Sequence, residues 1–229
     1  MGTLTIRDRE FNVTEATLCG GLYEQSGPTR VGATGVWVRH REDKQETRPQ
    51  WRCNWILNVE TAEREFPSED LEYPALWSPR AYSENMPVQV RSWKEFDGLV
   101  IEWDGPSKEE KSQLIGPFHL YVYEHADVTR NRLRFSFIGG LTFDLAWEGL
   151  CDVYADEEYS EDIPFRVETR VEFIGIRMVE SDPARAQDAI SQVLDPSEYI
   201  QHDPKPWDWG DEEPPNDGPY ADIWFEPRP

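Results

Sequence analysis

Strict alternation of apolar and polar residues in the second half of the chain most constrains the fold. In LRFSFIGGLTFDLAWEGLCDVYA, residues 133–155, two alternating runs are separated by Gly139 and Gly140. A period of two residues is that of a β-strand with one buried face. A glycine pair between two such runs is typical of a tight hairpin whose turn needs positive φ. The inward residues of this predicted hairpin are Leu133, Phe135, Phe137, Leu141, Phe143, Leu145, Trp147, Cys151 and Val153.

The alternation resumes after an acidic loop. Phe165, Val167, Val171 and Phe173 are expected to face inward, and the charged residues between them outward. The phase shifts beyond Phe173, where Gly175 could mark a β-bulge or the strand could be covered on both faces. With PFHLYVYEHA added before this block, residues 117–179 read as a meander of four long antiparallel strands.

Further candidate strands fill the first half, and one helix stands out. In SDPARAQDAISQVLDP, Asp182 or Ser181 is a candidate N-cap, Pro183 stands near the first helical position and Pro196 follows the end. The sequence therefore predicts a mainly β protein with one helix near residues 182–194. Its architecture is either an antiparallel β-sandwich or a strongly curved antiparallel sheet.

The C-terminal segment combines acidic residues and prolines with Trp207, Trp209, Tyr220, Trp224 and Phe225. A solvated tail has no use for aromatic rings, because it cannot bury them. We therefore predict one β-rich domain over residues 1–200 and an extended C-terminal tail over 201–229 that docks on it. In the alternative, Trp207 and Trp209 form an aromatic anchor for a cationic partner, and the rim of that anchor is Asp211, Glu212 and Glu213.

The formal net charge is −22, from 45 acidic and 23 basic residues. We expect no nucleic-acid or anionic-membrane binding, because either needs a basic surface. The charge either steers a basic partner or serves solubility in a salty cytoplasm. Cys19, Cys53 and Cys151 are widely spaced and odd in number, and the sequence carries no export signal or apolar stretch of membrane-spanning length. We expect a cytoplasmic protein with free thiols.

The sequence contains none of the common nucleotide-binding, zinc-protease, nucleophile-elbow or calcium-loop motifs. We therefore predict no cofactor, no metal and no catalytic residue, although enzymatic activity stays open. Asp144, Glu148 and Asp152 would lie beside Glu168 and Glu172 on an outward face. Such carboxylates could serve a glycosidase with tryptophan platforms, or could simply pair with the arginines on the same face, which are Arg166 and Arg170.

A second acidic cluster lies in the loop before residue 163. We predict that this loop contacts a basic partner through Asp156, Glu157, Glu158, Glu161 and Asp162.

The leading hypothesis is a non-catalytic, cytoplasmic protein-binding protein of the inhibitor or immunity type, which holds a basic partner through an acidic, aromatic-bearing surface. One alternative is a carbohydrate-binding or glycoside-hydrolase-like protein that uses a tryptophan-rich sheet and a carboxylate pair. A further alternative is a structural subunit of an assembly. The sequence does not predict the oligomeric state.

Overall fold

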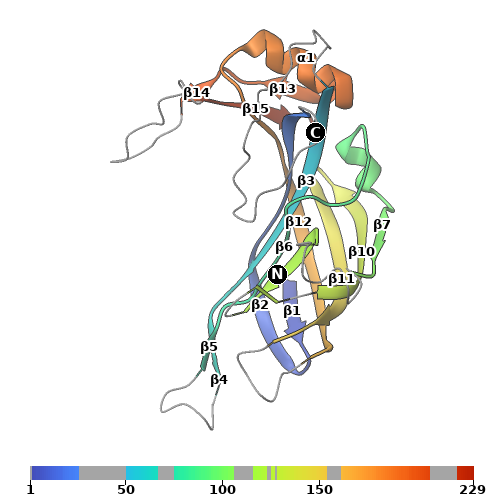
Figure 1. Ribbon diagram of the computed structural model, residues 1–229, viewed down its shortest axis with the longest axis vertical. Helices are drawn as coiled ribbons and strands as arrows, with labels where there is room; N and C mark the ends of the chain where they lie inside the picture. Colours follow the sequence, from blue (N-terminus) through green and yellow to red (C-terminus); the bar gives the residue numbers. More distant parts are fainter. Residues whose placement is uncertain are drawn as a thin grey trace.

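The computed structural model describes residues 2–25, 50–66, 75–105, 116–122, 125–126, 128–153, 161–206 and 221–229. This part of the chain is mainly antiparallel β structure with one α-helix, as the alternation predicts. Figure 1 shows long strands running along the molecule and the helix at one end.

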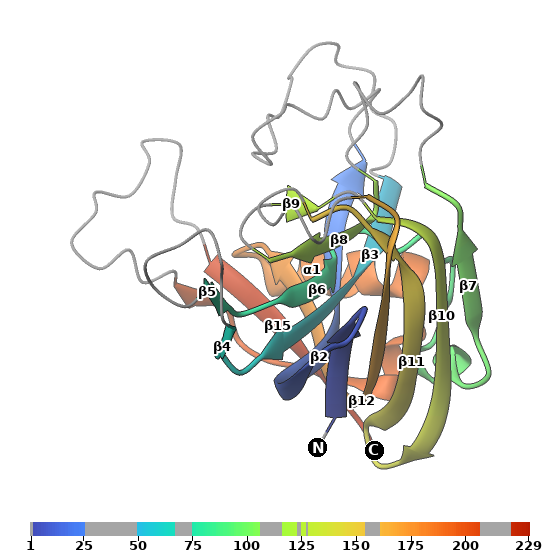
Figure 2. The ribbon, with the colours of Figure 1, turned by 90° about the horizontal axis from the view of Figure 1, so that it is seen from below.

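A 13-stranded sheet contains most of the described strands, and its main path runs β7-β10-β11-β12-β1-β2-β3-β6-β8-β9. Seen end-on, the sheet curls strongly from β7 round to β6 and β8 (Figure 2). Along this path the strands are β1 (Gly2–Ile6), β2 (Arg9–Gln25), β3 (Gln50–Thr61), β6 (Arg80–Ser83), β7 (Val100–Trp103), β8 (Phe118–Tyr121), β9 (His125–Ala126), β10 (Val128–Gly139), β11 (Thr142–Cys151) and β12 (Ile163–Val179). A separate two-stranded ribbon consists of β4 (Arg64–Phe66) and β5 (Ala75–Trp77).

Strands β10, β11 and β12 form the antiparallel meander predicted from the alternation. Gly139 and Gly140 turn the β10–β11 hairpin with φ of 126° and 59°, which confirms the predicted positive φ. The prediction was wrong for the first strand of the meander. β8 pairs with β6 and β9, while β7 pairs with β10 in its place. Alternation defines which face of a strand is buried but not which strand lies next to it.

Strand β12 connects two parts of the sheet. Its first half pairs with β11 and β1, and its second half pairs with β15 (Ala221–Pro227) on one side. On the other side it pairs in parallel with β2, which alternation alone did not indicate. The register shifts between Phe173 and Gly175, and Gly175 has a φ of 125°. Of the two alternatives for the phase shift, the bulge at Gly175 is the one that the register shows, and it lies where β12 changes partners.

Large aromatic rings fill the inner face of the sheet. The short 3-10 helix η1 (Trp93–Phe96) inserts two of them, because the Trp93 ring stacks 5.5 Å from that of Phe173 and the Phe96 ring lies 4.9 Å from that of Trp55. Ser92 caps η1 by accepting a hydrogen bond from the Lys94 backbone N–H. The inward residues predicted for β10 and β11 are buried here, except Phe137 and Leu141 near the hairpin tip, which are exposed and half-buried.

Helix α1 (Pro183–Val193) confirms the predicted helix near residues 182–194. Asp182 is its N-cap, and its Oδ1 accepts a hydrogen bond of 2.9 Å from the Ala184 backbone N–H. Ala186, Ala189 and Ile190 form the buried stripe of the helix. No helix in the described ranges is both long and apolar enough to cross a membrane.

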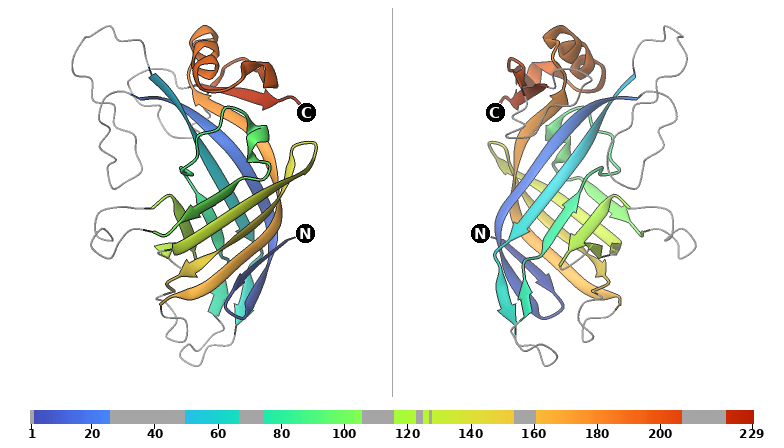
Figure 3. Two further views of the ribbon diagram at one scale, coloured as in Figure 1. Left: turned by 90° about the vertical axis from the view of Figure 1, so that its right-hand side faces the viewer. Right: turned by 60° about the vertical axis from the view of Figure 1, so that its left-hand side comes forward.

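The C-terminal strand β15 belongs to the same sheet. Besides β12, it pairs with β13 (Tyr199–Gln201) and β14 (Lys205–Pro206), and β13 follows the 3-10 helix η2 (Pro196–Glu198). These elements and α1 lie at one end of the curl (Figure 3). Ile223 and Phe225 are buried in the core. Trp207, Trp209 and Tyr220 lie outside the described residues, and the division of the chain at residue 200 stays a prediction.

Candidate functional site

The outer face of β7, β10, β11 and β12 presents charged side chains in rows that cross the strands. In one row, Glu102, Arg132, Glu148 and Arg166 are successive cross-strand neighbours. Arg132 lies 3.4 Å from a Glu102 carboxylate oxygen and 3.9 Å from one of Glu148. In a row nearer the hairpin tip, Arg170 Nε lies 3.8 Å from Asp144 Oδ1. Here the outward carboxylates pair with arginines of the same face.

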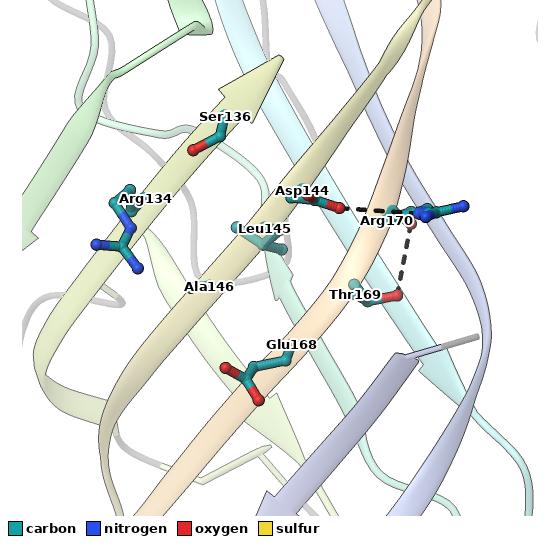
Figure 4. A pocket seen from close by; sticks show the side chains of 8 residues that line it. All are labelled: Arg134, Ser136, Asp144, Leu145, Ala146, Glu168, Thr169 and Arg170. Carbon is teal, nitrogen blue, oxygen red and sulfur yellow. Dashed lines mark hydrogen bonds and ion pairs between the residues drawn. The ribbon is translucent and has the colours of Figure 1, made fainter. Parts of the chain in front are cut away.

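The row between these two is interrupted. Its cross-strand neighbours are Arg134 on β10, Ala146 on β11 and Glu168 on β12. Because Ala146 has only a methyl group, it leaves a groove of about 530 Å³ in the charged surface. Figure 4 shows Arg134 and Glu168 on opposite sides of Ala146, with the Asp144–Arg170 ion pair beside them. We call this site the charged groove.

The two charged side chains of the interrupted row have different surroundings. Glu168 forms an ion pair with Arg166, two residues away on its own strand. Arg134 is exposed and forms no ion pair with any residue in the described part of the chain. Its cross-strand neighbours are Ala146 on one side and Val100, which is 44% exposed, on the other. The charged groove therefore offers one unpaired cation and, across a methyl floor, one carboxylate.

The tryptophans of these strands face away from the carboxylates. Trp147 is fully buried on the inner face, and its Nε1–H donates a hydrogen bond of 3.0 Å to Asn131 Oδ1. Trp51, Trp55, Trp77 and Trp93 are buried as well. A sugar platform needs exposed rings beside the carboxylates, and strands β7, β10, β11 and β12 place the two on opposite faces.

Asp152 corrects one of the predictions. The alternation placed it outward beside Asp144 and Glu148, but it is only 7% exposed. Its Oδ1 accepts a hydrogen bond of 2.9 Å from the Asp162 backbone N–H. Asp162 itself has a φ of 55°. A buried carboxylate needs a hydrogen-bond donor, and the Asp162 N–H provides one. This hydrogen bond holds Asp162 next to Asp152.

Of the residues predicted to contact a basic partner, the structure describes two. Glu161 and Asp162 are exposed at the start of β12. The remaining residues of the two predicted surfaces lie outside the described residues. These are Asp156, Glu157, Glu158, Trp207, Trp209, Asp211, Glu212 and Glu213.

The described thiols are poorly suited to nucleophilic chemistry. Cys19, Cys53 and Cys151 are free. Burial, and to a lesser extent the nearby Asp152 carboxylate, raises the pKa of Cys151 to about 12. Burial also raises the pKa of Cys53 and Cys19. Because the thiolate is the reactive form, these shifts make all three thiols less nucleophilic at neutral pH.

The described His, Cys, Asp and Glu side chains are not clustered as metal ligands either. Within the described ranges, no group of three or more His, Cys, Asp or Glu side chains is arranged to hold a metal ion. His119 instead stacks on the ring of its cross-strand neighbour Tyr82, with the ring centroids 4.9 Å apart.

A second, smaller groove of about 340 Å³ lies between η1 and the C-terminal end of α1. Its lining includes Arg91, Glu95 and Asp195. Hydrogen bonds from Ser197 lower the pKa of the Asp195 carboxyl, and the charges of Lys94 and Arg91 act in the same direction. The polar groups of this groove are engaged locally. The Glu95 carboxylate accepts from the Arg91 backbone N–H, and the Asp195 N–H donates to the Arg91 carbonyl.

Fold and surface together define an open, strongly curved, mainly antiparallel β protein whose charged outer face contains a shallow groove. Comparison with protein-family models, with curated proteins and with solved structures finds no match.

Proposed function

We propose that this protein is a non-catalytic, cytoplasmic binding protein that holds a basic protein partner through carboxylates left over from its own ion pairs. The observation that carries the proposal is that many of its cationic side chains are already ion-paired within the chain. Many arginines on the described surface already form ion pairs within the chain, while acidic residues outnumber basic ones by 45 to 23.

The ion pairs are spread over the molecule. Arg80 pairs with Glu60 on β3, Arg177 pairs with Asp222 on β15, and Lys94 pairs with Glu198 next to α1. Since each basic residue neutralises one negative charge, a large excess of carboxylates has no counter-charge inside the chain. Glu15, Glu84 and Glu172, for example, are exposed and form no ion pair with described residues. A surface of this kind attracts a cationic partner and accelerates its encounter.

The two predicted acidic segments are the best candidates for direct contact. Glu161 and Asp162 are exposed where the acidic loop meets β12, and the sequence places three more carboxylates just before them. Residues 207–213 combine two tryptophans with three successive acidic residues at 211–213. Aromatic rings surrounded by charge are the composition of an interface anchor.

The test is affinity capture from the native lysate with three matched variants, each of which removes three negative charges. The loop variant carries Asp156→Asn, Glu157→Gln and Glu158→Gln, and the tail variant carries Asp211→Asn, Glu212→Gln and Glu213→Gln. The control variant carries Glu15→Gln, Glu84→Gln and Asp188→Asn, all at exposed positions. Capture is repeated at about 0.05 M and about 1 M salt, where the Debye length falls to about 3 Å.

We expect the full-length protein to retain a basic partner at low salt and to lose it at high salt. The loop or tail variant should lose this partner while the control variant keeps it. An equal loss of the partner in all three variants would mean that the negative charge attracts proteins non-specifically and that neither segment is a binding site. Retention of the same proteins at both salt concentrations, or capture of no basic protein at all, would contradict the proposed function.

A further inference from the structure

We propose that the charged groove binds a small zwitterion, a molecule with a carboxylate at one end and an ammonium group at the other. Arg134 takes the carboxylate, Glu168 takes the ammonium group, and Ala146 forms the floor beneath the chain that joins them. This proposal is independent of the proposed function.

The geometry follows from the register of the strands. Arg134 and Glu168 lie directly opposite Ala146 from its two sides. Neighbouring strands are about 4.8 Å apart, so the backbones of β10 and β12 are separated by about 10 Å at this point. Figure 4 shows Arg134 on β10 and Glu168 on β12, one on each side of Ala146. The register therefore sets a guanidinium and a carboxylate two strands apart, on the two sides of an alanine.

The neighbouring rows explain why the ligand occupies this position and no other. On one side Asp144 pairs with Arg170, and on the other Glu148 pairs with Arg132. A carboxylate at position 146 would complete the middle row in the same way. Because alanine stands there, the guanidinium of Arg134 faces a space that an external carboxylate can fill.

The charge of the whole protein selects against simpler ligands. A free anion is repelled by a net charge of −22 before it reaches Arg134. A free cation meets the guanidinium groups of Arg134 and Arg170 at the groove. A zwitterion has no net charge and presents each end to the group that complements it. An arginine and a carboxylate on rigid strands also fix the direction in which the ligand lies.

The test uses γ-aminobutyrate as the probe, with butyrate and butylamine as single-charge controls. Binding is followed by the amide NMR signals of β10, β11 and β12 in the full-length protein. We expect a saturable shift centred on Ala146, with a dissociation constant on the order of 1 mM. Butyrate and butylamine should each bind at least about tenfold more weakly, because each satisfies only one of the two charges.

Three variants complete the design. Arg134→Gln and Glu168→Gln should each weaken γ-aminobutyrate binding about tenfold. Arg132→Gln is the matched control, since it also removes an exposed arginine from β10, but one that already forms ion pairs with Glu102 and Glu148. It should change the affinity less than about twofold. Thermal unfolding checks that all three variants fold.

Two results would overturn the proposal. Equal binding of butyrate and γ-aminobutyrate would show a plain anion site at Arg134. The absence of a saturable shift up to about 50 mM would show that the groove does not bind this class of ligand.

Discussion

Replacing Gly175 by alanine should lower the free energy of unfolding by about 4 kcal/mol. Gly175 has a φ of 125°, which is costly for any residue with a Cβ. A Cβ at this position would also lie 2.6 Å from the carbonyl oxygen of Phe225. Backbone strain and overpacking contribute about 1–3 kcal/mol each. Chemical denaturation at constant pH gives the difference directly.

Gly139 provides a matched control, because its φ is 126° but a Cβ there meets nothing within 4 Å. Gly139→Ala therefore carries the backbone strain without the clash, and should cost about 1–2 kcal/mol. Equal losses of unfolding free energy in the two variants would mean that the close contact between residue 175 and Phe225 of β15 adds nothing to the cost of the substitution.

The second large effect is expected for Phe225→Ala, which should lower the free energy of unfolding by about 3–5 kcal/mol. Phe225 is only 1% exposed and lies opposite Ile176 of β12 and Gln201 of β13. Its removal leaves a cavity where three strands meet. The measurement is again denaturant unfolding, with the slope of the transition checked for two-state behaviour.

The neighbouring residue is the control for this substitution. Glu226 is exposed, and its carboxylate lies 2.8 Å from the His202 ring in a pair open to solvent. Glu226→Ala should cost less than about 1 kcal/mol. A loss below about 1 kcal/mol for Phe225→Ala as well would contradict a core role of the C-terminal strand.

Local sequence patterns were sufficient to predict strands, turns and helix caps, because each of these depends on residues close together in the chain. Alternation around Phe135, Phe143 and Val167 gave the strands of the meander and their buried faces. The glycine pair gave the hairpin, and Asp182 with Pro183 gave the start of α1. In each case the information lies within a few residues, because strand faces, turns and caps depend on neighbouring backbone geometry.

Partners between distant segments could not be predicted in the same way. The pairing of β8 with β6 and the parallel pairing of β12 with β2 join segments far apart in the chain. Such pairings depend on how whole sheet faces pack together. The apolar–polar alternation within a strand does not change with the strand that lies next to it, so it cannot predict that neighbour. Asp152 was misplaced for a related reason, since its hydrogen-bond donor, the Asp162 N–H, belongs to the far end of a loop.

The charged groove could be predicted only in part from the sequence. Cross-strand pairing of carboxylates with Arg166 and Arg170 is one prediction for the outer face, and the Asp144–Arg170 ion pair agrees with it. Glu148 instead pairs with Arg132, and Arg166 pairs with Glu168 on its own strand. The groove itself was missed, because it needs the register that sets Arg134, Ala146 and Glu168 in one row. The available signal was an alanine at an outward position of an otherwise charged face.

The central structural claim is that the C-terminal strand and the meander form one cooperative sheet through β12. Removal of the residues beyond 200 would delete β15, whereas the charge-removing variants of the capture experiment keep this strand. Native-state hydrogen exchange tests the claim most directly. The slowest amides of β15, of the second half of β12 and of β10–β11 should all open with the same free energy, equal to that of global unfolding. Exchange of the β15 amides at a much lower free energy, while β10–β11 stay protected, would contradict the claim.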